Sequence, residues 1–200
     1  MVVKPALPPG QVLAKTFPIY SALGTPEIDV SQFKMRIFGA VRKPLEFSWE
    51  GLMQQQGIKK TEDFHCVTRW SRVGDVWEGI ALKPLLFSAQ PFGRFLMFHC
   101  YEGYTTNLPI EYIDDNAMLA FGFNGKPLEK IHGGPLRALV PTLYGWKSAK
   151  WINDIEVMEQ DKPGFWEQRG YNMRGDYTKE ERYWEGVGFV DKLRAIGKIL

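Results

Sequence analysis

The chain is organised around the stretch Phe64-His65-Cys66-Val67-Thr68-Arg69-Trp70-Ser71. The pattern indicates a strand from about Asp63 to Val67, followed by a polar loop. A free cysteine is most often a small buried hydrophobe. Here, however, His65 and Arg69 would favour the thiolate, which is the form that binds metals and attacks electrophiles. The stretch therefore predicts a reactive or metal-bound cysteine, Cys66, at the tip of a strand.

Most of the sequence has the pattern of β-strands. Apolar residues alternate with polar ones or form short runs at 33–39, 45–47, 95–100, 117–123 and 151–158. Short helices are expected at 48–56 and 82–89, with a helical turn at 109–115. Asn124-Gly125 predicts a hairpin, and polar loops are expected at 68–79 and 101–107. The predicted class is α+β, with a predominantly β, mixed-sheet body.

Length and composition are those of an ordinary globular protein. The 200 residues suit a single domain, and 44% hydrophobic with 24% charged residues can form a sizeable core. The proline-rich segment 1–31 is expected to lie over the surface. The tail 164–200 is rich in aromatic and charged residues, so we expect it to pack on the body rather than to be disordered.

Charge and cysteine content narrow the classes of function. A net charge of +2 argues neither for nor against nucleic-acid binding, because such binding depends on basic residues clustered on one face. No nucleic-acid partner is expected. Two cysteines do not make a secreted disulfide framework, although a single Cys66–Cys100 bridge could form and would block the thiol. The sequence shows no signal-peptide pattern, no twin arginine and no long apolar stretch. We therefore expect a cytoplasmic protein without a membrane span.

A second informative stretch, Ile131-His132-Gly133-Gly134-Pro135-Leu136-Arg137-Ala138-Leu139-Val140-Pro141, places an arginine within a short apolar strand. A guanidinium beside a buried strand is costly unless an anion meets it. Lys147, Ser148 and Lys150 follow between tryptophans. Together with Arg137 and the glycine amides they predict a phosphate-binding site. The alternatives are a structural ion pair for Arg137 and a solvated loop for the lysines.

Together the two stretches resemble the molybdopterin-binding catalytic domain of the sulfite oxidase family, in their residues, order and spacing. The resemblance implies a predominantly β sulfite oxidase-type fold and a mononuclear molybdenum cofactor with a single pyranopterin dithiolene. It also implies that Cys66 is the thiolate ligand of the metal. With the phosphate-site argument, it predicts cofactor contacts at Tyr20, Ser21, His65, Cys66, Cys100, Tyr101, His132, Arg137, Lys147, Ser148, Ala149 and Lys150.

The resemblance further implies an oxidoreductase that moves an oxygen atom, with two electrons, to or from a small sulfite- or sulfoxide-like substrate. Arg69, Tyr104 and Thr105 are the candidates for facing that substrate, through hydroxyl and guanidinium donors. The arginines with which sulfite oxidases hold sulfite are not matched, since Arg69 and Arg72 stand at other offsets from Cys66. A separate haem or flavin electron-transfer protein is expected, because the sequence carries no second redox motif.

Two other classes of function use the same residues. One is a cofactor-free binding module, whose pocket would take a phosphorylated ligand. The other is a thiol-redox protein that uses Cys66 and Cys100, although the sequence has no Cys-x-x-Cys spacing.

Overall fold

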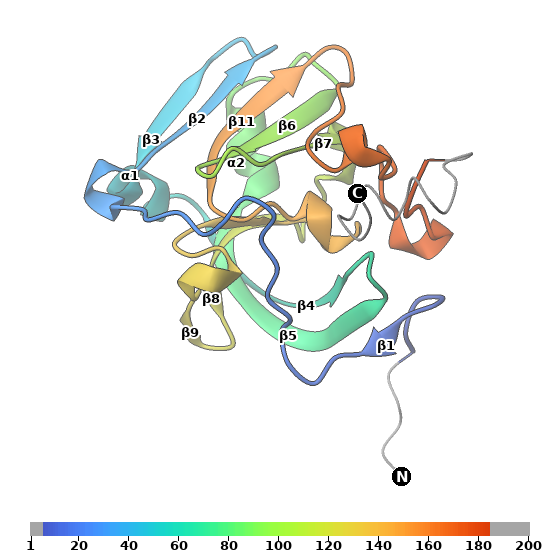
Figure 1. The fold of residues 1–200 in the computed structure, drawn as a ribbon. Helices are drawn as coiled ribbons and strands as arrows, with labels where there is room; N and C mark the ends of the chain where they lie inside the picture. The colour runs from blue at the N-terminus through green and yellow to red at the C-terminus, as the bar shows by residue number, and fades with distance from the viewer. Residues whose placement is uncertain (1–5, 185–200) are drawn as a thin grey trace.

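Two β-sheets form the body of the protein in the computed structural model, which describes residues 6–184. Within these residues the first sheet contains six strands: β1 (Val12–Leu13), β4 (Gly57–His65), β5 (Trp70–Ala81), β8 (Met118–Phe123), β9 (Lys126–Pro127) and β10 (Arg137–Leu139). The second contains five strands: β2 (Lys34–Gly39), β3 (Leu45–Ser48), β6 (Phe95–Cys100), β7 (Thr105–Pro109) and β11 (Ile152–Met158). In Figure 1 the second sheet lies above β4, β5 and β8 of the first.

Both sheets are mixed. In the first, the order is β1-β5-β8-β10, with β4 also on β5 and β9 on β8, and only the β1–β5 pair is parallel. In the second, the order is β3-β2-β11-β6-β7, with β11 parallel to β2. The predicted α+β class with a predominantly β body is therefore confirmed.

Helices are few and short in the described part of the chain. The α-helices are α1 (Trp49–Met53) and α2 (Leu82–Ser88). Single 3-10 turns occur at Val30–Gln32, Ile110–Tyr112, Lys130–His132, Gly145–Lys147, Glu167–Arg169 and Tyr177–Lys179. Ser48 caps α1 by accepting a hydrogen bond from the amide of Gly51, as its position before the helix predicted. No helix among these residues is long and apolar enough to cross a bilayer.

Two loops expected from their polar composition are partly strand. β5 begins at Trp70 and runs for 12 residues, so the loop predicted at 68–79 is reduced to the turn after His65. Its polar residues Ser71 and Asp75 are buried, because Ser71 bonds His65 of β4 and Asp75 forms an ion pair with Arg72. β7 begins at Thr105, within the loop predicted at 101–107. Thr106 and Asn107 are buried because distant residues supply their hydrogen-bond partners, Glu167 from the tail and Asp161 from the segment before it.

The tail packs on the body as far as residue 184, and residues 185–200 of the predicted tail lie outside the described residues. Trp166 and Tyr171 from the tail form an apolar cluster with Val67, Tyr144 and Trp146. This cluster lies next to the turn that carries Cys66, which also packs against it. The tail therefore contributes to the surroundings of the cysteine.

Candidate active site

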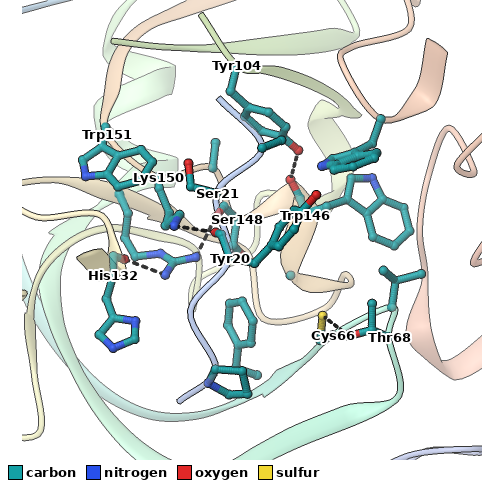
Figure 2. A pocket seen from close by; sticks show the side chains of 18 of the residues that line it. Tyr20, Ser21, Cys66, Thr68, Tyr104, His132, Trp146, Ser148, Lys150 and Trp151 are labelled. Atoms are coloured by element: carbon teal, nitrogen blue, oxygen red, sulfur yellow. Dashed lines mark hydrogen bonds between the residues drawn. The ribbon is translucent and has the colours of Figure 1, made fainter. Parts of the chain in front are cut away.

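A cavity of about 410 Å³ reaches from the Cys66 turn to the segment that follows β10 (Figure 2). Its walls come from parts of the chain that are far apart in sequence. They are residues 17–23 of the N-terminal segment, the end of β4, the loop after β6, the turns on either side of β10, and the tail. Figure 2 shows Cys66 and Thr68 on one side of the cavity and His132 and Lys150 on the other.

Cys66 stands at the first position after β4, in a tight turn. Its amide donates to the oxygen of Trp70 at 2.8 Å, and its own oxygen accepts from the amide of Arg69 at 3.0 Å. The sulfur lies 3.2 Å from Oγ1 of Thr68. Burial raises the pKa of the Cys66 thiol, whereas Thr68 and the charge of Arg182 act in the opposite direction. Both Cys66 and Cys100 are free thiols, so the possible disulfide is absent.

The two residues expected to favour the thiolate do not line the cavity. His65 is buried on the other face of the strand, where Nδ1 lies 2.8 Å from Oγ of Ser71 and the ring packs on Tyr177. Successive side chains of a strand point to opposite faces, so His65 and Cys66 must diverge. Arg69 is exposed, with a left-handed φ of 75°. The cation that acts on the thiol is Arg182, which the motif did not identify.

Arg137 and Lys150 form the basic side of the cavity. The guanidinium of Arg137 is buried, and its Nη1 and Nη2 donate to the oxygens of His132 and Ser148 at 2.8 and 2.7 Å. Burial lowers the pKa of Arg137 to about 10. Lys150 donates to the oxygen of Tyr20 at 2.7 Å, and its pKa falls to about 8 because of burial and the nearby Arg137.

Neither cation has a carboxylate at ion-pair distance among residues 6–184. Buried charges normally have a partner of opposite sign. The proposed structural ion pair for Arg137 is therefore not formed, and an anionic ligand is the partner that this arrangement suits. His132, Ser148 and Ala149 also line the cavity, as do Tyr20 and Ser21.

Lys147 is not part of this basic side. Its side chain has no exposed surface, and its ammonium lies 2.6 Å from Oε1 of Glu167 and 2.7 Å from the oxygen of Met173. It also donates to Asn107 of β7. The partners come from β7 and the tail, which the local motif cannot reveal. Of the three cations predicted for the phosphate site, Arg137 and Lys150 line the cavity, together with Ser148.

The loop after β6 contributes Glu102 rather than the neighbours that were predicted. Cys100 is buried in the main core, and Tyr101 turns outward, with its hydroxyl 3.4 Å from the oxygen of Lys34. Glu102 lines the cavity, and its Oε2 is buried without a hydrogen-bond partner among the described residues. Burial raises the pKa of Glu102 to about 7. An unpaired buried acceptor is unusual, and this one is open to a donor from water or from a ligand in the cavity.

Of Arg69, Tyr104 and Thr105, which were expected to face substrate, only Tyr104 lines the cavity. The hydroxyl of Tyr104 donates to the oxygen of Trp146 at 2.7 Å, so this group is already engaged. Thr105 lies in β7 opposite His99 and does not line the cavity.

An aromatic wall from the tail was missed by the motif analysis. Trp166 and Tyr171 line the cavity near Cys66, with their rings stacked at a centroid distance of 4.9 Å, and Trp146 meets Tyr171 edge-on at 5.1 Å. Burial and the neighbouring Tyr183 and Cys66 raise the pKa of Tyr171, so its hydroxyl keeps its proton. The aromatic richness of the tail was the available signal.

Comparisons with known proteins find a matching family and several relatives. Residues 22–166 match a family described as "Oxidoreductase molybdopterin binding domain". The chain is 36% identical to the uncharacterized oxidoreductase YuiH of Bacillus subtilis, over 88% of this chain and 91% of that protein. It is 29% identical to the protein-methionine-sulfoxide reductase catalytic subunit MsrP of Campylobacter jejuni, over 75% of this chain and 57% of that one.

A solved structure shows the same architecture. The sulfane dehydrogenase SoxCD of Paracoccus pantotrophus superposes with a TM-score of 0.61 at 26% identity. The match covers 68% of this chain and 41% of that chain. The chain thus spans almost all of one bacterial relative, but only about half of the reductase subunit and less of the dehydrogenase.

Proposed function

Because this chain belongs to the molybdopterin-binding oxidoreductase family, we propose that it carries one molybdenum pyranopterin and transfers an oxygen atom to or from a small, uncharged oxide such as a sulfoxide. The observation that carries the proposal is the distribution of groups in the cavity. A soft sulfur ligand stands on one side, and the buried Arg137 and half-buried Lys150, neither paired with a carboxylate, stand on the other.

The donor set fits such a cofactor. The sulfur of Cys66 would bind the metal, since soft thiolate ligands suit metals already held by dithiolene sulfur. Arg137 and Lys150 would hold the phosphate, which supplies the negative charge that the two cations lack. The unpaired Oε2 of Glu102 would accept a hydrogen bond from the N–H edge of the pterin ring. When bound, the cofactor supplies a two-electron redox centre.

The side of the cavity at Cys66 favours an uncharged substrate. Its wall is made by Val67, Thr68, Trp146, Trp166 and Tyr171, and no cation stands among these residues. A dianion such as sulfite would lose its hydration there without a cation in the wall to contact it, since Arg182 lies behind the turn and bonds the oxygen of Val67. An oxide with apolar substituents would instead bury them against the aromatic rings. The similarity to a protein-methionine-sulfoxide reductase subunit is in line with a sulfoxide.

Tyr171 is the group best placed to supply a hydrogen bond to the substrate oxygen. Its hydroxyl lies near Cys66, and burial keeps it protonated. In a site from which water is excluded, a positioned donor stabilises charge that develops on oxygen. We therefore assign Tyr171 to orienting the oxide, in place of Arg69 and Thr105.

A separate haem or flavin protein is proposed as the electron partner. The described residues offer one candidate redox centre, and the cycle must exchange two electrons with another molecule. A single-domain organisation and a cytoplasmic location stay predictions from the sequence.

Metal analysis combined with a substrate screen tests the proposal. The protein would be purified from a host that makes molybdopterin and assayed with a reduced dye and sulfoxides or N-oxides, and with an oxidised dye and sulfite. We expect about one molybdenum per chain, turnover of an uncharged oxide and loss of the metal in Cys66→Ala. A wild-type protein without molybdenum that binds a phosphorylated ligand would contradict the proposal and favour a cofactor-free binding module.

A further inference from the structure

The turn that carries Cys66 is held from behind by two side chains from opposite ends of the described chain. Nε2 of Gln11 donates to the main-chain oxygen of Cys66 at 3.0 Å. Nη1 of Arg182 donates to the main-chain oxygen of Val67 at 2.6 Å. Neither Gln11 nor Arg182 lines the cavity, so both act on the turn from outside it.

These contacts add to the bonds within the turn itself. There the amide of Cys66 donates to the oxygen of Trp70, and the oxygen of Cys66 accepts from the amide of Arg69. The bond from Gln11 is a second one to the same oxygen, and the bond from Arg182 fixes the next peptide group. The direction of the Cys66 side chain depends on both peptide groups.

Both side chains are deeply placed. Arg182 is 6% exposed and Gln11 is 9% exposed. The guanidinium of Arg182 lies 4.7 Å from the ring centroid of Tyr144, and its Nη2 donates to the oxygen of Pro9 at 3.2 Å. Arg182 therefore joins the N-terminal segment, the Cys66 turn and the tail at one point.

The two groups do not satisfy all their own polar atoms in this place. Oε1 of Gln11 and Nε of Arg182 are buried without a hydrogen-bond partner in residues 6–184. Leaving a buried polar atom unpaired costs free energy. The bond from Gln11 and the bond from Nη1 of Arg182 nevertheless converge on the turn of Cys66, while Nη2 of Arg182 bonds Pro9 and Glu180.

We propose that Gln11 and Arg182 are positioning residues that fix the direction in which Cys66 presents its sulfur to the molybdenum, an inference that rests on the proposed function. Groups that orient a metal ligand without touching the metal commonly change affinity or activity when they are lost. Both ends of the described chain are then required for the geometry of the site, although neither supplies the ligand.

Three variants of the molybdenum-containing protein test this inference. Gln11→Met and Arg182→Met remove the donors while keeping length, and Arg182→Lys keeps a charge and one donor. The control is Arg174→Met, since Arg174 lies in the same tail segment and pairs with Glu181 without touching the turn. The measurements are molybdenum content, the sulfur-to-molybdenum absorption band, the EPR spectrum of the partly reduced protein, and kcat and KM with a sulfoxide.

We expect the Met variants to shift the absorption band and the EPR spectrum and to lower kcat about tenfold or more, with KM changed by less than about twofold. Arg182→Lys should lie between wild type and Arg182→Met, and Arg174→Met should match wild type. If a Met variant does not fold, the spectrum of Arg182→Lys decides alone. Wild-type spectra in folded variants, or activity losses that only follow the folded fraction, would overturn the inference while leaving the proposed function intact. Absence of molybdenum from the wild type would instead defeat the proposed function.

Discussion

The ammonium of Lys147 lies 2.6 Å from Oε1 of Glu167, and neither side chain has any exposed surface. The same carboxylate oxygen accepts from Nε1 of Trp146 at 2.8 Å and from Oγ1 of Thr106 at 2.9 Å. Glu167 therefore ties three elements together: the segment after β10, the strand β7 and the tail that forms the aromatic wall. Lys147, which the sequence analysis placed in the phosphate site, instead helps to hold the aromatic wall in place.

Replacing Glu167 by Gln should destabilise the protein strongly. The ammonium of Lys147 would remain buried without its counter-charge, and breaking a buried pair in this way costs about 3–5 kcal/mol. Urea unfolding of wild type and Glu167→Gln measures the difference. Glu27→Gln is the control, because Glu27 pairs with Lys130 at the surface, where such a pair is worth about 0–1 kcal/mol. Equal losses of unfolding free energy in the two variants would show that the buried pair stabilises the protein no more than the surface pair does.

Position 145 requires a glycine, because the ring of Phe64 leaves no room for a side chain there. A Cβ at this position would lie 2.3 Å from the ring of Phe64, which itself packs under the guanidinium of Arg137. Gly145→Ala should therefore cost about 1–3 kcal/mol through overpacking and weaken cofactor retention by moving the ring. Gly51→Ala in α1 is the matched control, since its nearest neighbour is 3.6 Å away. Thermal unfolding and metal content decide, and an unchanged Gly145→Ala protein would contradict the packing argument.

Glu102 should make the cofactor-free protein less stable as the pH rises. Its pKa is about 7 in the folded chain against an ordinary value of 4.5, so the unfolded chain loses this proton first. A raised carboxyl pKa means that stability falls between about pH 4.5 and 7. Glu102→Gln should thus have a higher free energy of unfolding than wild type at pH 8, and a smaller advantage at pH 4. Urea unfolding measures this, with protein from a host that makes no molybdopterin. The exposed Glu111→Gln should show no such difference between the two pH values. A gain for Glu102→Gln that is equal at both pH values would refute the assignment.

The sequence predicts most strands because apolar alternation is local, and it places Cys66, Arg137, Ser148 and Lys150 because they stand in two compact motifs. It fails where a residue's partner is distant. Lys147 and Lys150 look alike in sequence, yet only Lys147 meets a carboxylate, which stands 20 residues later. Residues 70–79 of β5 were expected to be a loop because their polar side chains gave no sign that β4 and β8 would pair with them. Glu102 and Tyr171 become site residues only when the loop after β6 and the tail meet at the cavity.

Tyr171→Phe should lower kcat for a sulfoxide more than it changes KM. The ring stacks on Trp166 with or without the hydroxyl, so the wall that binds the substrate is kept. A donor that acts on developing charge is worth about 10²–10³ in kcat at most, and a partial loss of about tenfold or more is expected here. Steady-state kinetics check this, with Tyr112→Phe as the control, since Tyr112 lies in the turn after β7 and does not line the cavity. A rise in KM alone would indicate that the hydroxyl serves binding and not the reaction.

Lys150 should make anion binding by the cofactor-free protein depend on pH. Its pKa is about 8, because burial and Arg137 oppose its charge, so the ammonium that an anion needs is lost as the pH rises through that value. Sulfate is a suitable probe, since its own charge is constant in this range. If only the charged form binds, a pKa of about 8 makes sulfate affinity about tenfold weaker at pH 9 than at pH 7. Isothermal titration calorimetry measures this.

Two lysine variants are the controls. Lys150→Met should bind sulfate weakly at both pH values and lose the pH dependence. Lys147→Met, if it folds, should keep the pH dependence, because the ammonium of Lys147 is paired with Glu167. Sulfate affinity that is the same at pH 7 and pH 9 in the wild type would remove Lys150 from the anion site and leave Arg137 to hold the phosphate alone.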